Sequence, residues 1–194
     1  DIPVVKALRL PSRYLITPEP DSMSETAFLE RLEEKAMSGI ELVQLRSKRL
    51  SKDSFLKLCE QVSKICQSHL TKLVVNASPV DIQGVALDGF HLSVSNWKSL
   101  NQRPVSDNQL MGVSCHSPEE LIEVARLNPD FIVLGPVKQT ATHPGAMSLG
   151  WGVFSKWIEA IPVPVYALGG MTEDDIALAH AHGAQGIAAI RGLW

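Results

Sequence analysis

The chain has 194 residues, of which 45% are hydrophobic and 20% are charged, and its formal net charge is -3 with neutral histidines. This profile is typical of one globular domain, which at this length buries roughly 70% of its unfolded surface without disulfides or a structural metal. The small negative charge and the absence of a polybasic run or a long apolar stretch exclude a general nucleic-acid binder and a membrane protein.

Eight short apolar segments follow one another along the chain. Each is continuously apolar rather than alternating, which is typical of strands buried on both faces of a parallel sheet. The predicted strands are 14–17, 42–45, 73–76, 89–92, 110–114, 131–134, 163–168 and 186–189.

Helical patterns fill the segments between these strands. Helices are predicted over 24–38 and 51–69, where apolar residues recur at helical spacing. Two more are predicted to begin at Ser117 and at Thr172, because each residue can cap a helix and is followed by acidic residues. A short helix is expected near residues 80–87.

Eight βα repeats without a long linker predict a compact (β/α)8 barrel, the TIM barrel, over residues 13–194. Residues 1–12 are then a linker or an N-terminal extension. An open doubly wound sheet is the alternative, but no GxGxxG motif follows the first strand. In such barrels the functional residues lie at the carboxyl ends of the strands.

Gly169-Gly170 follows the seventh strand and precedes the helix start at Thr172. Glycines allow an anion to approach the backbone N–H groups, and the loops after strands 7 and 8 are the usual phosphate site of this fold. The sequence therefore predicts a phosphate site at Gly169, Gly170, Ile190 and Arg191, although a plain tight turn would also explain the glycines.

The second strand ends in Gln44-Leu45-Arg46-Ser47-Lys48. Alternation along a strand places Gln44, Arg46 and Lys48 on one face, where an amide and two cations would suit a phosphorylated ligand. A solvated strand end is the alternative.

Other polar residues follow the remaining strands. We expect Asn76, His91, Ser114 and His116 at the rim, with the histidines as candidates for acid–base chemistry. The loop after the sixth strand adds Thr140, Thr142 and His143. Carboxylates are scarce there, so no metal site is predicted from the residues.

Several spaced motifs resemble one family, that of thiamine phosphate synthase and the TenI-type thiazole tautomerase. They run in the family's order along nearly the whole chain. The matching segments are Tyr14 to Thr17, Gln44 to Lys48, Gly89 to Leu92, Gly112 to Ser117, Gly135 to Val137 with Thr140 to Thr142, and Ala167 to Met171.

The resemblance implies that a pyrimidine diphosphate loses pyrophosphate with help from Mg2+ and is then attacked by a thiazole phosphate. It places Gln44, Arg46, Lys48 and Asn76 around the pyrimidine diphosphate. It implies contacts with the diphosphate or the thiazole phosphate for Ser114, Thr140 and Thr142, and contacts with the thiazole phosphate for Gly170, Ile190 and Arg191. Together with the residue patterns, this makes Lys48, Ser114 and His116 the catalytic candidates, adds His91 and His143 as substrate-binding candidates, and keeps Gly169 in the phosphate site.

The chain departs from the family at the metal ligands. Ala77 and Asn96 replace the two carboxylates that bind Mg2+ in the synthase, so this cofactor lacks its expected ligands. Pro136 occupies the position of the tautomerase's catalytic histidine.

Three functions follow from the resemblance: a synthase-type transferase with a degenerate Mg2+ site, a tautomerase-like enzyme, or a non-catalytic module that binds thiamine phosphates. Residues 5–11 resemble the linker of fusions with an N-terminal Nudix (MutT-like) hydrolase. The expected partner is a small phosphorylated substrate, and a homodimer is compatible with the sequence. Three cysteines without CxxC spacing favour a reducing, cytoplasmic location.

Overall fold

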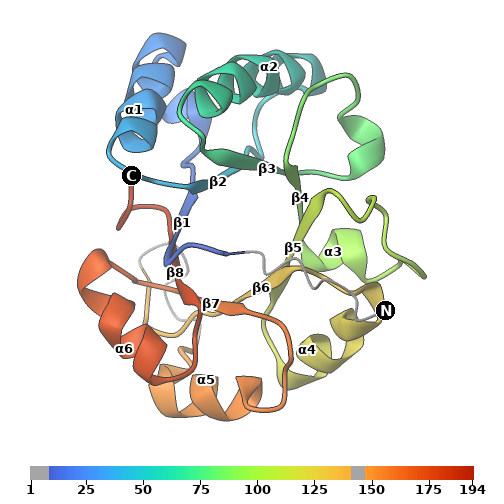
Figure 1. The fold of residues 1–194 in the computed structure, drawn as a ribbon, viewed down its shortest axis with the longest axis vertical. Coiled ribbons are helices and arrows are strands. Elements are labelled where there is room, and N and C mark those ends of the chain that lie inside the picture. The colour runs from blue at the N-terminus through green and yellow to red at the C-terminus, as the bar shows by residue number, and fades with distance from the viewer. Residues whose placement is uncertain (1–8, 141–146) are drawn as a thin grey trace.

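Eight parallel strands pair in sequence order and close into a barrel in the computed structural model, which describes residues 9–140 and 147–194. Figure 1 looks along this barrel and shows the helices arranged around it. The predicted TIM barrel is confirmed, and each predicted strand overlaps an observed one. The strands are β1 (Arg13–Ile16), β2 (Leu42–Leu45), β3 (Lys72–Asn76), β4 (Gly89–Leu92), β5 (Leu110–Cys115), β6 (Phe131–Leu134), β7 (Val165–Leu168) and β8 (Gly186–Ala189).

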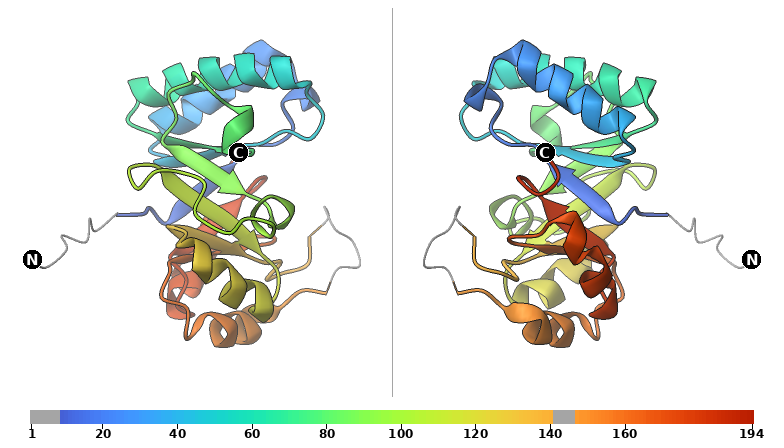
Figure 2. Two further views of the ribbon diagram at one scale, coloured as in Figure 1. Left: turned by 90° about the vertical axis from the view of Figure 1, so that its right-hand side faces the viewer. Right: turned by 90° about the vertical axis from the view of Figure 1, so that its left-hand side faces the viewer.

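Helices of very different length connect the strands. The longest are α1 and α2, which lie side by side on one flank of the barrel (Figure 2), and both begin after a serine, Ser24 or Ser51, whose side chain caps the helix. The helices in the described residues are α1 (Glu25–Met37), α2 (Lys52–Ser68), α3 (Val94–Trp97), α4 (Pro118–Val124), α5 (Gly150–Ile158) and α6 (Ile176–Ala181). Single 3-10 turns occur at η1 (Pro20–Ser22), η2 (Pro79–Asp81), η3 (Ala125–Leu127) and η4 (Glu173–Asp175).

The predicted helix near residues 80–87 is wrong. The structure has only the turn η2 there, followed by Ile82 in an extended conformation. Gly84 has a φ of +79°, which no right-handed helix can include. The connection between β3 and β4 is therefore an irregular loop.

The strands separate two hydrophobic cores, because successive side chains point to opposite faces. One core lies between the strands and the helices and includes Leu15 on β1 and Val43 on β2. Inside the barrel, Tyr14, Phe131 and Tyr166 pack with tilted or edge-on rings. The barrel is therefore filled by side chains and is not a pore.

The amino-terminal end of the barrel is closed by the residues just before β1. The Tyr166 hydroxyl donates to the Pro11 carbonyl at 2.7 Å, and the Ile187 N–H donates to the Ser12 carbonyl at 2.9 Å. The end of the segment predicted as a linker thus contributes to the barrel.

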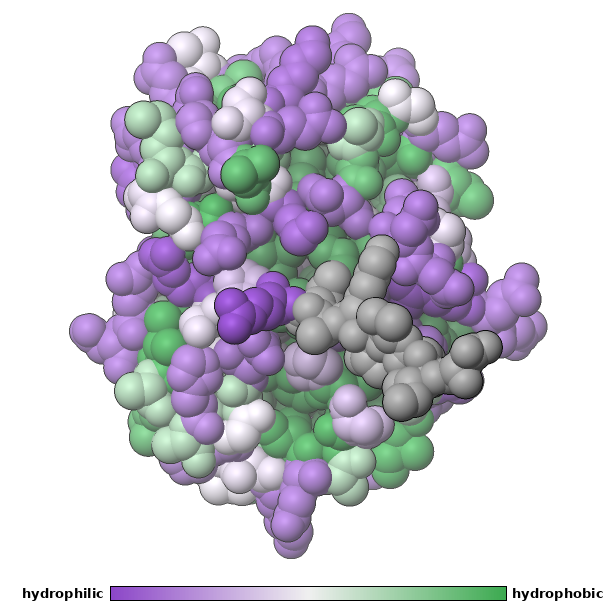
Figure 3. Space-filling model, in the orientation of Figure 1, coloured by the Kyte–Doolittle hydropathy of each residue, from purple (hydrophilic) through white to green (hydrophobic). Residues whose placement is uncertain are grey.

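Hydrophilic residues are spread over the molecular face drawn in Figure 3, with hydrophobic residues interspersed. Among residues 9–140 and 147–194, no helix has the length and apolar character needed to cross a bilayer.

Candidate functional site at the carboxyl ends of the strands

A pocket of about 480 Å³ lies where the loops after β6, β7 and β8 meet. Most of its lining is apolar or backbone, which suits a small ligand held by a few polar contacts. Six of the residues predicted for the site line it together: His116, Thr140, Gly169, Gly170, Ile190 and Arg191.

The two glycines of the β7 loop are required by their surroundings. Gly169 has a φ of +113° and Gly170 a φ of +65°, both in the left-handed region that side chains disfavour. A Cβ atom on Gly169 would lie 2.7 Å from the Cα of Pro136 and 2.8 Å from the nitrogen of Val137. The β6 loop can therefore pack directly on the β7 loop only where glycine is present.

Backbone hydrogen bonds join these two loops beyond the end of the sheet. The Val137 N–H donates to the Leu168 carbonyl at 2.7 Å, and the Lys138 N–H donates to the Gly169 carbonyl at 3.3 Å. The loop that carries the two glycines is thus fixed along one side by its neighbour.

An ion pair adds a second attachment between the same loops. The Lys138 Nζ donates to Asp175 Oδ1 at 2.6 Å, and Asp175 Oδ2 accepts from the Thr172 N–H at 2.9 Å. Burial acts to raise the pKa of Asp175, but the hydrogen bonds from Lys138 and Thr172, with the Lys138 charge, hold it below its usual value. Asp175 therefore stays ionised and anchors both loops.

The helix that follows the glycines is shorter than the sequence suggests. It begins with the 3-10 turn η4, where Thr172 and Asp175 form a capping box, and α6 then has only six residues. The macrodipole of so short a helix is small, so backbone N–H groups and nearby cations must provide most of any anion stabilisation.

Arg191 is the cation that borders this pocket on the β8 side. It sits in a turn closed by the Trp194 N–H, which donates to the Ile190 carbonyl at 2.9 Å. The Arg31 Nε on α1 donates to the Trp194 carbonyl at 3.0 Å, and the rings of Phe28 and Trp194 lie 5.1 Å apart. The backbone around Arg191 is therefore anchored, while its side chain is exposed.

The opposite side of the barrel mouth is built from side chains. Gln44, Asn76, His91 and Ser114 all point into the barrel and are connected by hydrogen bonds. Asn76 Nδ2 donates to Gln44 Oε1 at 2.9 Å, and Tyr14 bridges Gln44 to His91. His91 Nε2 lies 2.8 Å from Ser114 Oγ. Four predicted site residues thus form one connected group.

His91 lies below the rim rather than on it, because its side chain is only 1% exposed. Burial, together with the Arg46 charge, lowers the pKa of His91 to about 3. Its ring is therefore neutral, and both ring nitrogens have protein partners.

The two predicted cations after β2 differ in position. Arg46 is half-buried, and its N–H donates to Thr17 Oγ1 at 3.2 Å. Lys48 is exposed, and its N–H donates to a carboxylate oxygen of Glu19. Glu19 also accepts from Ser47 Oγ at 2.9 Å, so it organises this loop.

His116 extends into the pocket from the end of β5, and its side chain is 61% exposed. Its N–H donates to Glu120 Oε1 at 2.7 Å, and its Nδ1 lies 3.4 Å from the same oxygen. The neighbouring Cys115 is a poor nucleophile, because burial raises the pKa of its thiol to about 12.

The part of this rim that the structure describes offers no site suited to a divalent cation. Ala77 and Asn96 offer no carboxylate, and the described residues contain no group of three or more potential ligands from His, Cys, Asp and Glu. The predicted residues Thr142 and His143 lie outside the described residues.

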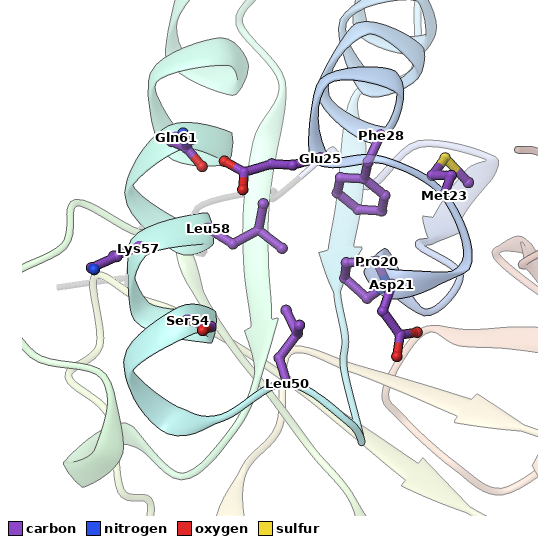
Figure 4. A pocket seen from close by; sticks show the side chains of 10 residues that line it. All are labelled: Pro20, Asp21, Met23, Glu25, Phe28, Leu50, Ser54, Lys57, Leu58 and Gln61. Carbon is purple, nitrogen blue, oxygen red and sulfur yellow. The ribbon is translucent and has the colours of Figure 1, made fainter.

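Two further cavities lie away from the barrel mouth. One of about 330 Å³ opens between α1 and α2, where Phe28 and Leu58 form an apolar floor beside Glu25 and Lys57 (Figure 4). Another of about 700 Å³ lies between α5 and α6. Neither includes a residue predicted for the site.

Tyr14 and Glu19 are the residues of this region that sequence reasoning missed. Tyr14 is wholly buried on the interior face of β1, and a buried tyrosine hydroxyl needs a partner. Tyr14 could therefore have been predicted from the sequence as part of a buried hydrogen-bond group. Glu19 could not, because it follows β1 in an irregular loop.

A family model described as thiamine monophosphate synthase (TMP-TENI) matches residues 13–193. A putative thiamine-phosphate synthase 2 of Aquifex aeolicus is 33% identical over 183 residues, which cover 94% of this chain and 97% of that protein. A thiamine-phosphate synthase of Fusobacterium nucleatum is 28% identical, covering 93% of this chain and 87% of that protein.

Among solved structures, a thiamine phosphate pyrophosphorylase from Pyrococcus furiosus superimposes with a TM-score of 0.75 at 22% identity, covering 94% of this chain and 86% of that one. A geranylgeranylglyceryl phosphate synthase from Thermoplasma acidophilum gives a TM-score of 0.64 at 13% identity, covering 95% and 87% of the two chains. At these identities the structural matches show a shared fold.

Proposed function

Because this chain belongs to the thiamine monophosphate synthase family, and so to thiamine biosynthesis, we propose that its barrel mouth binds a thiazole phosphate. The phosphate would occupy the pocket between the β7 and β8 loops. The observation that supports this best is the meeting of bare Gly169-Gly170 backbone with Arg191 in one pocket. Backbone N–H groups and a guanidinium are the donors that a phosphate needs.

We propose that the second half of the ligand, an aminopyrimidine, lies over β2 and β3. Asn76 supplies an amide there, held by the buried Gln44, and Arg46 supplies a positive charge for a leaving diphosphate. The reaction type is that of a thiamine-phosphate synthase, in which the two heterocycles are joined and pyrophosphate is released. Without carboxylates at positions 77 and 96, binding is retained more fully than turnover.

Calorimetry on the purified chain tests the binding proposal. Thiazole phosphate and thiamine phosphate should both bind, and Arg191→Ala should weaken each by about 10- to 100-fold through loss of a charge-assisted hydrogen bond. Arg49→Ala is the matched control, because the Arg49 guanidinium pairs with the exposed Asp21 at 3.5 Å. Absence of heat with both ligands would exclude the proposal.

A second candidate is acid–base catalysis on the thiazole phosphate, of the tautomerase type. It is favoured by His116, which borders the pocket and is paired with Glu120. His116→Ala should then abolish turnover while leaving phosphate binding intact. His69→Ala is the control, because His69 pairs with Glu33 at 3.1 Å outside the barrel mouth. Equal turnover of both variants would reject this role for His116.

The location, the fusion partner and the oligomeric state of the chain are also proposals. We propose that the protein is cytoplasmic, that an N-terminal Nudix domain precedes this barrel in the full-length product, and that the protein forms a homodimer. The coding sequence upstream of Asp1 tests the fusion. Sedimentation of the purified chain tests the dimer.

A further inference from the structure

A continuous chain of hydrogen bonds crosses the barrel beneath the mouth. It runs from Asn76 on β3 through Gln44 on β2 and Tyr14 on β1 to His91 on β4 and Ser114 on β5. Each link is 2.8 or 2.9 Å long. The hydrogen-bond chain therefore connects the part of the mouth proposed for the aminopyrimidine with Ser114, two residues before His116, which lines the pocket proposed for the phosphate.

The two ends of this hydrogen-bond chain reach the mouth, and its centre does not. Tyr14, Gln44 and His91 are 0%, 2% and 1% exposed, whereas Asn76 and Ser114 are half-buried. The three central side chains therefore act on a ligand through the ends. In such a dry interior each hydrogen-bonding group must be satisfied by its neighbour.

A glycine makes room for the central ring. A Cβ atom on Gly112 would lie 2.4 Å from the Phe131 ring and 2.9 Å from His91 Nδ1. The Phe131 ring and the imidazole thus both lie where a side chain at position 112 would be, with their ring centroids 6.3 Å apart. This packing holds both ring nitrogens in line with Tyr14 and Ser114.

The donors along the hydrogen-bond chain must all point the same way. The Tyr14 hydroxyl has one proton and accepts from the Gln44 amide, so its proton goes to His91 Nδ1. The neutral ring then carries its proton on Nε2 and donates it to Ser114 Oγ. The Ser114 hydroxyl proton is left for a group in the mouth, and Asn76 Oδ1 is left as an acceptor.

Turning both amides around would reverse every link. The Ser114 hydroxyl would then donate its proton to His91 Nε2, and only its lone pairs would face the mouth. Next to a bound phosphate that arrangement is repulsive, whereas a hydroxyl proton is attractive. An amino group over Asn76 and an anion near Ser114 therefore favour the same direction.

We propose that Tyr14 and His91 are positioning residues, which set the direction of this hydrogen-bond chain so that the mouth presents an acceptor at Asn76 and a donor at Ser114. The ligand class that matches this pair carries an amino group at one end and anionic oxygens at the other. The assignment of ligand ends rests on the proposed function, whereas the direction of the hydrogen bonds follows from the orientation of the Gln44 and Asn76 amides.

The direction of these hydrogen bonds can be measured by NMR at neutral pH on the 194-residue chain with isotope-labelled histidine. We expect the His91 ring to carry its proton on Nε2, and Tyr14→Phe to change that tautomer distribution because Nδ1 loses its donor. Tyr166→Phe is the matched control, because it removes an interior hydroxyl that binds Pro11 at the other end of the barrel. A wild-type proton on Nδ1, or an unchanged ring in Tyr14→Phe, would overturn the proposal.

Calorimetry with thiamine phosphate gives the functional measurement. Tyr14→Phe should weaken binding about 5- to 20-fold through the loss of two linked hydrogen bonds, and Tyr166→Phe should leave it within about twofold. Equal weakening by both variants would indicate a structural role only and would reject positioning. If the wild type binds no thiamine phosphate, the proposed function fails, while the NMR result still decides the direction of the hydrogen bonds.

Discussion

The two sides of the barrel mouth are built in different ways. The side formed by the β6, β7 and β8 loops presents backbone, because Gly169 and Gly170 have no side chains to cover it. Hydrogen bonds between neighbouring loops fix this backbone. The side formed by β1 to β5 presents side chains that contact one another inside the barrel. Backbone sites depend on local conformation, whereas the side-chain site depends on which strands are neighbours.

The resemblance predicts that the two sides also differ in how far they depart from the family pattern. The side formed by the β6, β7 and β8 loops is expected to keep the glycines of a phosphate site, with Arg191 as an added cation. The other side is expected to keep its amides, with Ala77 and Asn96 in place of two metal-binding carboxylates. Loss of a metal site would leave amide and backbone contacts in place, so ligand binding and metal-dependent turnover would separate.

Gly169→Ala is expected to have the largest effect, because it breaks the backbone side. The new Cβ would overlap Pro136 and would force a side chain into the left-handed region. The free energy of unfolding should fall by about 2–4 kcal/mol, and phosphate-ligand affinity should fall at least about 30-fold. Urea denaturation and calorimetry measure the two effects.

Gly84→Ala provides the control for that substitution. Gly84 also has a positive φ, but a Cβ atom there would have no neighbour within 4 Å among the described residues. Strain alone should lower the free energy of unfolding by about 1–2 kcal/mol, with ligand affinity unchanged. Unchanged affinity in Gly169→Ala as well would show that the phosphate does not use this loop.

The double substitution Ala77→Asp with Asn96→Asp tests the side-chain half. Two carboxylates should restore ligands for Mg2+, so that pyrimidine diphosphate binds roughly tenfold more tightly with the metal than without it. Thiazole phosphate affinity should stay the same, because its pocket is on the other side. Metal-independent diphosphate binding in the double variant would show that positions 77 and 96 do not form the metal site. A changed affinity for thiazole phosphate would contradict the separation of the two halves.

Lys138→Met should have the smallest effect, because the side chains of its ion pair with Asp175 are 45% and 12% exposed. At neutral pH we expect a loss of roughly 1 kcal/mol in the free energy of unfolding. The pKa of Asp175 is lowered in the folded state, so the pair stabilises the fold above about pH 4 and loses that contribution as pH falls through the folded value.

Urea denaturation of wild type and Lys138→Met across acidic pH measures this difference, which should shrink toward low pH. Lys52→Met is the control, because its pair with Asp81 at 3.1 Å is more exposed on both sides. A gap that is constant with pH would mean that Lys138 acts through packing rather than through its charge.

The barrel, its strands and the meeting of the β7 and β8 loops in one pocket could all be predicted from the order of the residues. Those features depend on local patterns: continuous apolar runs, serine caps, and paired glycines after a strand. The one failed element, the helix near 80–87, was a weak pattern interrupted by Gly84, whose backbone is left-handed.

The hydrogen bonds within the side-chain half of the mouth could not be predicted in this way, although Gln44, Asn76, His91 and Ser114 were expected there. Closure of the barrel brings β1 beside β2 and β8, and the pleat then turns Tyr14 and Gln44 to the same interior. Closure also places His91 beneath the rim, although the sequence predicts it on the rim. Which buried polar groups satisfy one another depends on contacts between distant segments, and a single strand's pattern does not contain that information.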